Sequence, residues 1–143
     1  MNIGIANDHR GFKLKQKLTN FLKEKGYNII DYGTSSDISV DYPVYAFKVG
    51  EAIRDNKIDF GILICGTGIG MSIACNKVKN VRCAKVSSID EAILSRQHND
   101  ANVIAISENT EDALEIIITF LNTKFSNEEK HIRRVEMINN YDN

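Results

Sequence analysis

The sequence has no excess of charge of either sign and no long apolar run. Its 18 basic and 19 acidic side chains give a formal net charge of −1, so no bulk positive field would draw the chain to nucleic acid or to an anionic membrane. No apolar run approaches the roughly 18 residues that a membrane-spanning helix needs. The N-terminus opens directly into an apolar segment without a basic region, so we expect no signal peptide.

Cysteine and proline are also scarce. The three cysteines form no CxxC pair, and an odd number of them cannot all pair within one chain. Free thiols and a cytoplasmic location fit this usage best. Because the 143 residues contain no linker, repeat or low-complexity segment, we expect one domain over residues 1–143.

What the sequence does contain is a regular alternation of apolar strands and helical segments. The predicted strands are 2–8, 27–33, 60–65, 81–88 and 102–107. The predicted helices are 11–26, 44–57 (with Pro43, the only proline, in its first turn), 69–78, 89–98, 110–125 and 128–141. Five alternations predict an α/β fold, a three-layer α/β/α sandwich with a five-stranded parallel sheet of the Rossmann-like kind.

Polar residues cluster where the predicted strands begin or end. Asn7, Asp8 and His9 follow the first strand, and Cys65 follows an unbroken apolar run in the third. The segment 98–100, "HND", precedes the fifth strand. Ligands of such sheets bind beyond the carboxyl ends of the strands. We therefore expect the thiol, the two imidazoles and the small polar groups to meet at one edge of the sheet.

The glycines Gly66, Gly68 and Gly70 after the cysteine match neither the dinucleotide fingerprint nor a P-loop. Two interpretations remain open for them. They either allow only a tight turn from strand to helix, or they expose backbone N–H groups at a helix N-terminus as an anion site. In the second case Thr67 and Ser72 would add hydroxyl groups nearby.

Other candidate residues have a structural and a functional interpretation as well. Cys65 either closes a core strand or is a reactive thiol, because the positive end of a helix dipole favours the thiolate. Asp8 fits a helix N-cap, and capping is compatible with ligand contact. His9 is either a surface histidine or part of the site. Cys75 and Cys83 fall inside a predicted helix and strand, so we expect them in the core.

Taken together, five segments resemble the type B ribose-5-phosphate isomerases. They are "NDH" at 7–9, "DYP" at 41–43, "ICGTGIGMSIACNK" at 64–77, "SRQHNDANV" at 95–103 and "RRVEM" at 133–137. The resemblance spans nearly the whole chain in order. It implies interconversion of an aldose phosphate and a ketose phosphate through a cis-enediolate, without metal or organic cofactor. It also implies the strand order 2-1-3-5-4.

The resemblance assigns roles at the reaction centre. The position of Cys65 is that of the base that moves the proton between C1 and C2. The amides of Gly66, Gly68 and Gly70, with Thr67, would hold the enediolate oxygen as an oxyanion hole.

Further roles follow from the same resemblance. The residue at the position of His98 opens the sugar ring, and Asn99 matches a residue that contacts the reacting oxygens. Asp8 and Tyr42 match sugar-contacting positions, and His9 matches a phosphate ligand. The resemblance also implies a homodimer or a dimer of dimers with shared active sites. In it, the His98–Asn99 segment and the C-terminal helix, about 128–141, reach the partner's cysteine loop.

The expected phosphate clamp departs from the family pattern. The usual arginine after the fifth strand falls near Asn109, and a second one falls on Lys130. Only Arg134 matches cleanly, and its neighbour Arg133 fits a solvated helix face. Lysine can bind phosphate, but without the bidentate fork of arginine.

Two alternatives stay open at this point. The nearer is a galactose- or allose-6-phosphate isomerase of the same family. The further is a non-catalytic nucleotide-binding module on a similar sheet, which would bind ATP or AMP and would need neither Cys65 nor His98.

Overall fold

The computed structural model describes residues 1–141 and contains one five-stranded sheet. The strands are β1 (Asn2–Asn7), β2 (Asn28–Asp31), β3 (Phe60–Cys65), β4 (Cys83–Lys85) and β5 (Val103–Ser107). Every pairing is parallel and the order is β2-β1-β3-β5-β4, so the predicted fold class and strand order are confirmed.

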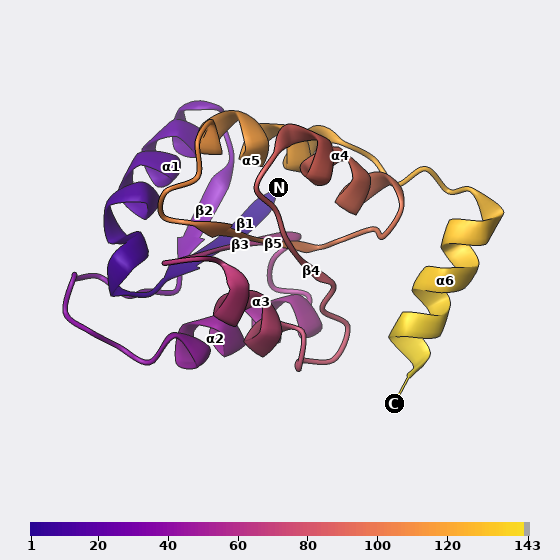
Figure 1. Ribbon diagram of the computed structural model, residues 1–143, viewed down its shortest axis with the longest axis horizontal. Helices are drawn as coiled ribbons and strands as arrows, with labels where there is room; N and C mark the ends of the chain where they lie inside the picture. The colour runs from indigo at the N-terminus through magenta and orange to yellow at the C-terminus, as the bar shows by residue number, and fades with distance from the viewer. Residues whose placement is uncertain (142–143) are drawn as a thin grey trace.

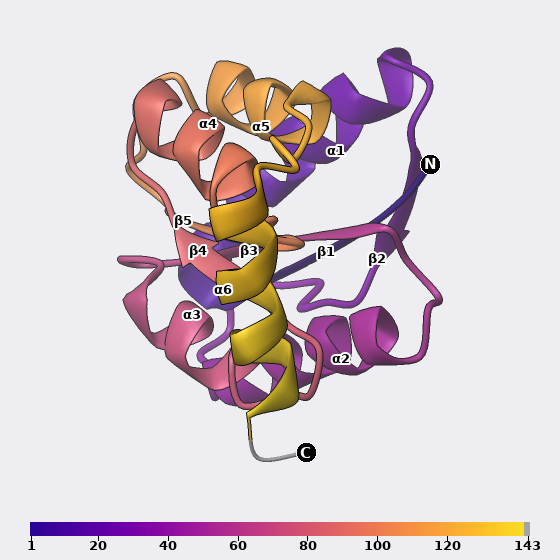
Figure 2. The same cartoon turned by 90° about the vertical axis from the view of Figure 1, so that its right-hand side faces the viewer.

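Helices cover both faces of this sheet. They are α1 (Phe12–Glu24), α2 (Tyr42–Arg54), α3 (Ile69–Cys75), α4 (Ile89–Gln97), α5 (Ala113–Asn122) and α6 (Glu129–Asn140), and the short 3₁₀ turn η1 (His9–Gly11) precedes α1. Helices α1, α4 and α5 lie on one face, and α2 and α3 lie on the other (Figure 1). Helix α6 stands beside the sandwich at the β4 edge (Figures 1 and 2). Within residues 1–141, no helix combines the length and the apolar character needed to cross a membrane.

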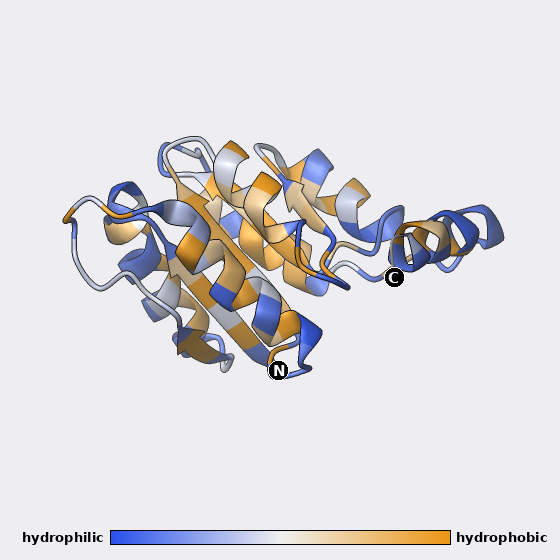
Figure 3. Cartoon of the chain, turned by 90° about the horizontal axis from the view of Figure 1, so that it is seen from below, coloured by the Kyte–Doolittle hydropathy of each residue, from blue (hydrophilic) through white to orange (hydrophobic). Residues whose placement is uncertain are grey.

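Each face of the sheet has its own apolar core, because successive side chains of a strand point to opposite faces. On β3, Ile62 and Ile64 pack with α1 and α5, whereas Leu63 and Cys65 pack with α2 and α3. The strands are predominantly apolar along their length (Figure 3), as expected for a parallel sheet buried on both sides. The Cys65 side chain is therefore directed to the α2–α3 face.

Every predicted strand and helix except β3 is shorter in the structure than the sequence pattern indicates, and the reason is visible for α3, β4 and α5. Helix α3 ends at Cys75 because the next side chain, Asn76, bonds the backbone of Cys83, accepting from its N–H at 2.7 Å and donating to its carbonyl at 2.9 Å. The same contact marks the start of β4. Helix α5 begins only at Ala113, since Asp112 has φ 56° and cannot continue a right-handed helix.

Candidate active site

The polar residues after β1 and β3 lie side by side at the point where the order of the strands across the sheet reverses. Strand β1 is paired with β3, with Asn7 opposite Ile64. The chain leaves β1 for α1 on one face and leaves β3 for α3 on the other (Figure 1). Such a switch point opens a crevice at the carboxyl ends of the strands, where ligands of α/β sheets bind.

The Cys65 loop, residues 65–70, is held by hydrogen bonds from its own chain. The Cys65 sulfur is buried and accepts a hydrogen bond from the Gly68 N–H at 3.0 Å. The Thr67 hydroxyl oxygen accepts from the Ile69 N–H at 3.2 Å, and the Ser107 hydroxyl donates to the Gly66 carbonyl at 2.7 Å. Of the three glycine amides expected for an anion site, that of Gly68 is thus already used inside the loop, by the thiol itself.

Two glycines of the Cys65 loop are required by the space around them. Gly68 has φ 81°, and a Cβ there would lie 3.0 Å from the Ile106 carbonyl carbon. A Cβ on Gly70 would lie 2.6 Å from the ring of Tyr42. Gly68 therefore makes the tight turn from strand to helix that the sequence predicts. The ring of Tyr42 lies against the start of α3, next to the loop.

Asp8 ties the end of β1 to this loop. Its carboxylate accepts from the N–H groups of Arg10 and Gly11 at 2.9 and 3.2 Å, so the N-cap interpretation is correct, with η1 as the capped element. The Asp8 N–H donates to the Ile64 carbonyl at 3.1 Å, one residue before Cys65. The buried carboxylate is thus fixed beside the end of β3.

His9 follows Asp8 and faces the loop between β2 and α2. Its Nδ1 accepts a hydrogen bond from the Val40 N–H at 3.3 Å. A neutral imidazole that accepts at Nδ1 carries its proton on Nε2. His9 can therefore donate a hydrogen bond to an anion from Nε2.

An ion pair at the rim of the Cys65 loop was not foreseen from the sequence. Nε and Nη2 of Arg10 donate to one carboxylate oxygen of Glu108 at 3.2 and 2.7 Å. This pairing raises the pKa of the Arg10 guanidinium. Arg10 directly follows the Asp8–His9 pair, and Glu108 directly follows β5. Their positions next to two strand ends are the signal that could have identified them.

His98 and Asn99 do not join Cys65 in one chain, so the expectation that they meet at one edge is wrong. His98 ends α4, and the segment after it leads into the start of β5, where the Gly61 N–H donates to the Asn102 carbonyl at 2.9 Å. Gly61 and Cys65 lie at opposite ends of β3, about 13 Å apart at roughly 3.3 Å per residue. The reason is direction: α4 runs antiparallel to the strands and ends at their amino edge.

Two arginines fix the turn that carries His98 and Asn99. Arg82 and Arg96 each bind a different carboxylate oxygen of Asp100, at 3.3 and 2.8 Å. Asp100 itself has φ 47°, a left-handed conformation that Asp tolerates better than most residues. The two residues before it are thus presented at the surface by a rigid turn.

Helix α6 is attached to the same turn. The ring of His131 stacks on that of His98, with centroids 4.3 Å apart and planes at 15°. His131 is largely buried, which lowers its pKa, and the neighbouring His98 lowers it further. Lys130 and Arg134 are exposed on the same helix. The structure therefore brings His98, Asn99 and the two basic residues to one side of the chain, away from Cys65.

The other two cysteines lie further along α3 and on β4. Cys75 is fully buried, as expected, and Cys83 is partly exposed. A hydrogen bond with Cys75 and burial raise the pKa of Cys83 well above its usual value, while the Ser72 hydroxyl acts in the opposite direction. Ser72 is thus within reach of Cys83, on the part of α3 that leads away from the Cys65 loop.

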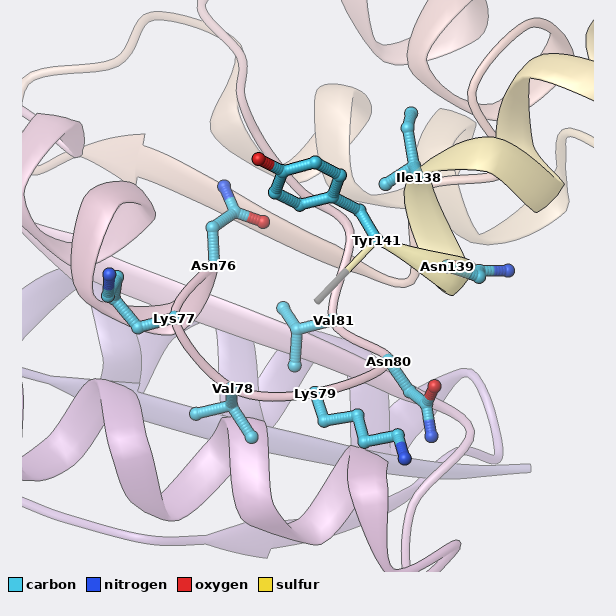
Figure 4. Close-up of a pocket in the computed structure, with 9 residues that line it drawn as sticks. All are labelled: Asn76, Lys77, Val78, Lys79, Asn80, Val81, Ile138, Asn139 and Tyr141. Atoms are coloured by element: carbon cyan, nitrogen blue, oxygen red, sulfur yellow. The ribbon is translucent and has the colours of Figure 1, made fainter. Parts of the chain in front are cut away.

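A hollow of about 350 Å³ separates the end of α6 from the segment 76–81. Figure 4 shows the ring of Tyr141, just after α6, directed toward Asn76, with Ile138 on the α6 side of the hollow. None of the site residues predicted from the sequence lines this hollow. It is bordered by exposed apolar side chains, Tyr141 being 82% exposed.

The fold and the Cys65 loop define a class: a Rossmann-like α/β protein whose binding crevice, at the β1–β3 switch point, carries a thiol on a glycine-rich turn. Within that class, residues 3–138 match the ribose/galactose isomerase family. The chain belongs to this family.

Named relatives and solved structures agree with this assignment. The chain is 42% identical to ribose-5-phosphate isomerase B of Escherichia coli K12, over 95% of this chain and 93% of that protein. The structure of ribose-5-phosphate isomerase B from Clostridium thermocellum superposes with a TM-score of 0.94 at 45% identity, covering 97% and 95% of the two chains. That of the Mycoplasma genitalium enzyme with bound ribulose 5-phosphate gives 0.93 at 41% identity, covering 98% and 95%.

Proposed function

We propose that the chain interconverts ribose 5-phosphate and ribulose 5-phosphate, with Cys65 moving the proton between C1 and C2. The chain is an aldose–ketose isomerase of sugar phosphates. The thiol's role is supported by its position. Cys65 is the last residue of β3 and lies at the switch point, next to the Asp8–His9 segment that follows β1. The pentose is supported by two relatives named ribose-5-phosphate isomerase B, one of them with ribulose 5-phosphate bound.

In the proposed reaction Cys65 removes the proton from C2 of the open-chain aldose and returns it to C1, while a proton passes from O2 to O1. The intermediate is a cis-enediolate, whose negative oxygen would be held by Thr67 and by the amides of the Cys65 loop that make no hydrogen bond within it. The Gly68 N–H contributes by fixing the sulfur at 3.0 Å. Asp8 and Tyr42 would contact the sugar, and His9 would donate from Nε2 to the phosphate.

The remaining groups would come from a second copy of the chain. His98 and Asn99 lie at the opposite edge of the sheet from Cys65, so one chain cannot supply both halves of the site. Helix α6 stands away from the body and exposes Met137 and Ile138 (Figure 1). We propose a homodimer, alone or paired into a tetramer, in which apolar side chains of α6 are covered by the partner.

In this dimer, His98 of the partner subunit would open the sugar ring, and Asn99 of the partner subunit would contact the reacting oxygens. Lys130 and Arg134 of the partner subunit would reach the phosphate. The stacking of His98 on His131 supports this grouping, because it holds the ring-opening residue and the basic helix together as one unit.

The substrate is tested with a panel of sugar phosphates. We expect turnover of ribose 5-phosphate and ribulose 5-phosphate to exceed that of galactose 6-phosphate and allose 6-phosphate. Preference for either hexose phosphate would overturn the pentose assignment and favour the nearer alternative. Binding of ATP or AMP without any isomerase activity would overturn the function as a whole.

The shared site is tested by mixing two variants that are both strongly impaired on ribose 5-phosphate, Cys65→Ala and His98→Asn. If each site takes its thiol from one subunit and its imidazole from the other, half of the randomly mixed dimers contain one intact site of two. Activity on ribose 5-phosphate should then recover to about a quarter of the wild-type value. No recovery after dissociation and reassociation of the subunits would show that each site lies within a single chain.

A further inference from the structure

Arg10 has no role in the reaction as described so far, yet its guanidinium lies next to Gly66 of the Cys65 loop. A Cβ built on Gly66 would come within 3.1 Å of Nη1 and 3.3 Å of Cζ of Arg10. The side chain is 55% exposed, and its head group therefore faces both the loop and solvent. Any anion that enters the proposed reaction centre would therefore come close to this positive charge.

The hydrogen bonds of Arg10 leave part of its guanidinium available. Nε and Nη2 both donate to the same oxygen of Glu108. Nη1 donates to no side chain or carbonyl within residues 1–141. An arginine with two N–H groups directed away from its carboxylate partner can bind a phosphate oxygen without first leaving that partner.

The neighbours of Arg10 are those of a phosphate site. His9, the preceding residue, accepts at Nδ1 and therefore offers a donor at Nε2. Asn109, immediately after Glu108, is uncharged, so the β5 side of this rim supplies no cation of its own. Among the residues that follow β1, β3 and β5 directly, 8–10, 66–68 and 108–110, Arg10 is the only one with a permanently positive side chain.

We propose that Arg10 binds the phosphate group of the substrate, given the isomerase function proposed above. Glu108 holds the guanidinium at the rim in the free protein, and its negative charge opposes an incoming phosphate. The ion pair is partly exposed, which weakens this opposition, whereas the charge-assisted hydrogen bond from Nη1 to a phosphate dianion is strong, so the phosphate binds while Arg10 keeps its contact with Glu108. Arg10 acts in the same chain as Cys65, whereas Lys130 and Arg134 would come from the partner subunit.

The first test is steady-state kinetics of Arg10→Ala. We expect KM for ribose 5-phosphate to rise by about 10- to 150-fold with kcat changed by less than about threefold, because phosphate is bound equally in the ground and transition states. The matched control is Arg54→Ala, which removes an arginine of similar exposure from an ion pair with Asp55 at the far end of α2. Its kinetics should equal those of the wild type.

The second test does not depend on catalysis. Affinity for inorganic phosphate, measured by ³¹P NMR or calorimetry, should fall in Arg10→Ala and stay unchanged in Arg54→Ala. Glu108→Gln should instead raise the phosphate affinity by about two- to fivefold, since it removes a competing charge worth little at the surface. Because phosphate binding is measured directly, Arg10 is tested even if the chain proves to prefer another sugar phosphate.

A rescue variant separates phosphate binding from a structural role. Asn109→Arg in the Arg10→Ala background restores a guanidinium to the same rim, and we expect it to recover most of the lost phosphate affinity. Unchanged phosphate affinity in Arg10→Ala would overturn the proposal. So would a loss confined to kcat together with a shifted pH profile for alkylation of Cys65, because Arg10 would then act on the thiol and not on the phosphate.

Discussion

The two halves of the proposed site lie at opposite ends of the strands, and they differ in burial and in hydrogen bonding. At the carboxyl edge, Cys65 and Asp8 are buried, and their side chains accept hydrogen bonds from the backbone of the same chain. At the amino edge, His98 and Asn99 are exposed on a turn that Arg82 and Arg96 hold rigid from behind. One half is complete within the chain, and the other is presented outward.

This difference indicates which catalytic groups are held within one chain and which are supplied by a second subunit in the proposed site. A base must be held in position before substrate arrives, because proton transfer depends on distance and alignment. The fold holds the thiol in position because the Gly68 N–H donates to its sulfur and the Ser107 hydroxyl donates to the Gly66 carbonyl. Groups that open a ring or bind phosphate can be delivered by a second subunit, provided that the turn and the helix carrying them are rigid.

Removing the thiol should have the largest effect and tests the buried half directly. Cys65→Ala should lower kcat by about 10²- to 10⁴-fold or more, as expected for loss of the proton-transferring group, while the circular dichroism spectrum stays native. Cys75→Ala, which removes the buried thiol of α3, should remain active. A Cys65→Ala enzyme with more than a tenth of the wild-type turnover would show that another group is the base.

Removing the exposed imidazole should have a smaller and direction-dependent effect. His98→Asn should lower the rate on ribose 5-phosphate by about 100-fold. It should affect ribulose 5-phosphate far less, because that ketose cannot close a furanose ring. Initial rates in both directions give the comparison. Equal losses would contradict a ring-opening role.

The basic residues of α6 should follow in a defined order. Arg134→Ala should lower kcat/KM by about 10- to 150-fold, mainly through KM, since a charge-assisted hydrogen bond contributes about 1.5–3 kcal/mol. Lys130→Ala should cost less, because its ammonium is more hydrated, and Arg133→Ala least. Lys130→Arg should lower KM. If Arg133→Ala proved the most damaging, the assignment of the two positions on α6 would be off by one residue.

Acid should weaken the attachment of α6 slightly. Burial holds the pKa of His131 below its usual value of 6.5, so the unfolded chain binds more protons than the folded chain as the pH falls through that value. The stability that the neutral ring provides is present above about pH 6.5 and is lost below it. The charged neighbours are Glu128, which opposes this shift, and Lys130 and Arg134, which add to it.

Melting temperatures at pH 7.5 and pH 5.5 measure this loss. In His131→Phe the ring can still stack on His98 but cannot be protonated, so the drop between the two pH values should be smaller than in the wild type. An equal drop in both proteins would show that other groups set the acid sensitivity.

Local pattern was sufficient to identify the elements and several site residues. The unbroken apolar run before Cys65 predicts a central parallel strand, and the glycines after it predict the tight turn that Gly68 makes at φ 81°. Asp8 was correctly interpreted as a cap. Periodicity and capping depend on neighbours in sequence, and these the sequence contains.

Tertiary structure alone decided which residues meet. A segment that precedes a strand of a parallel sheet lies at the amino ends of the strands, and the path of α4 places "HND" there, far from Cys65. No local pattern pairs Arg10 with Glu108, 98 residues later in the chain. Their contact arises because β1 and β5 flank β3 and end at the same edge.

The sequence by itself determined the strands, the turn and the reactive residue types, because those depend on short-range sterics and periodicity. The edge at which each group lies was decided by strand order and helix direction, which are properties of the packed sheet.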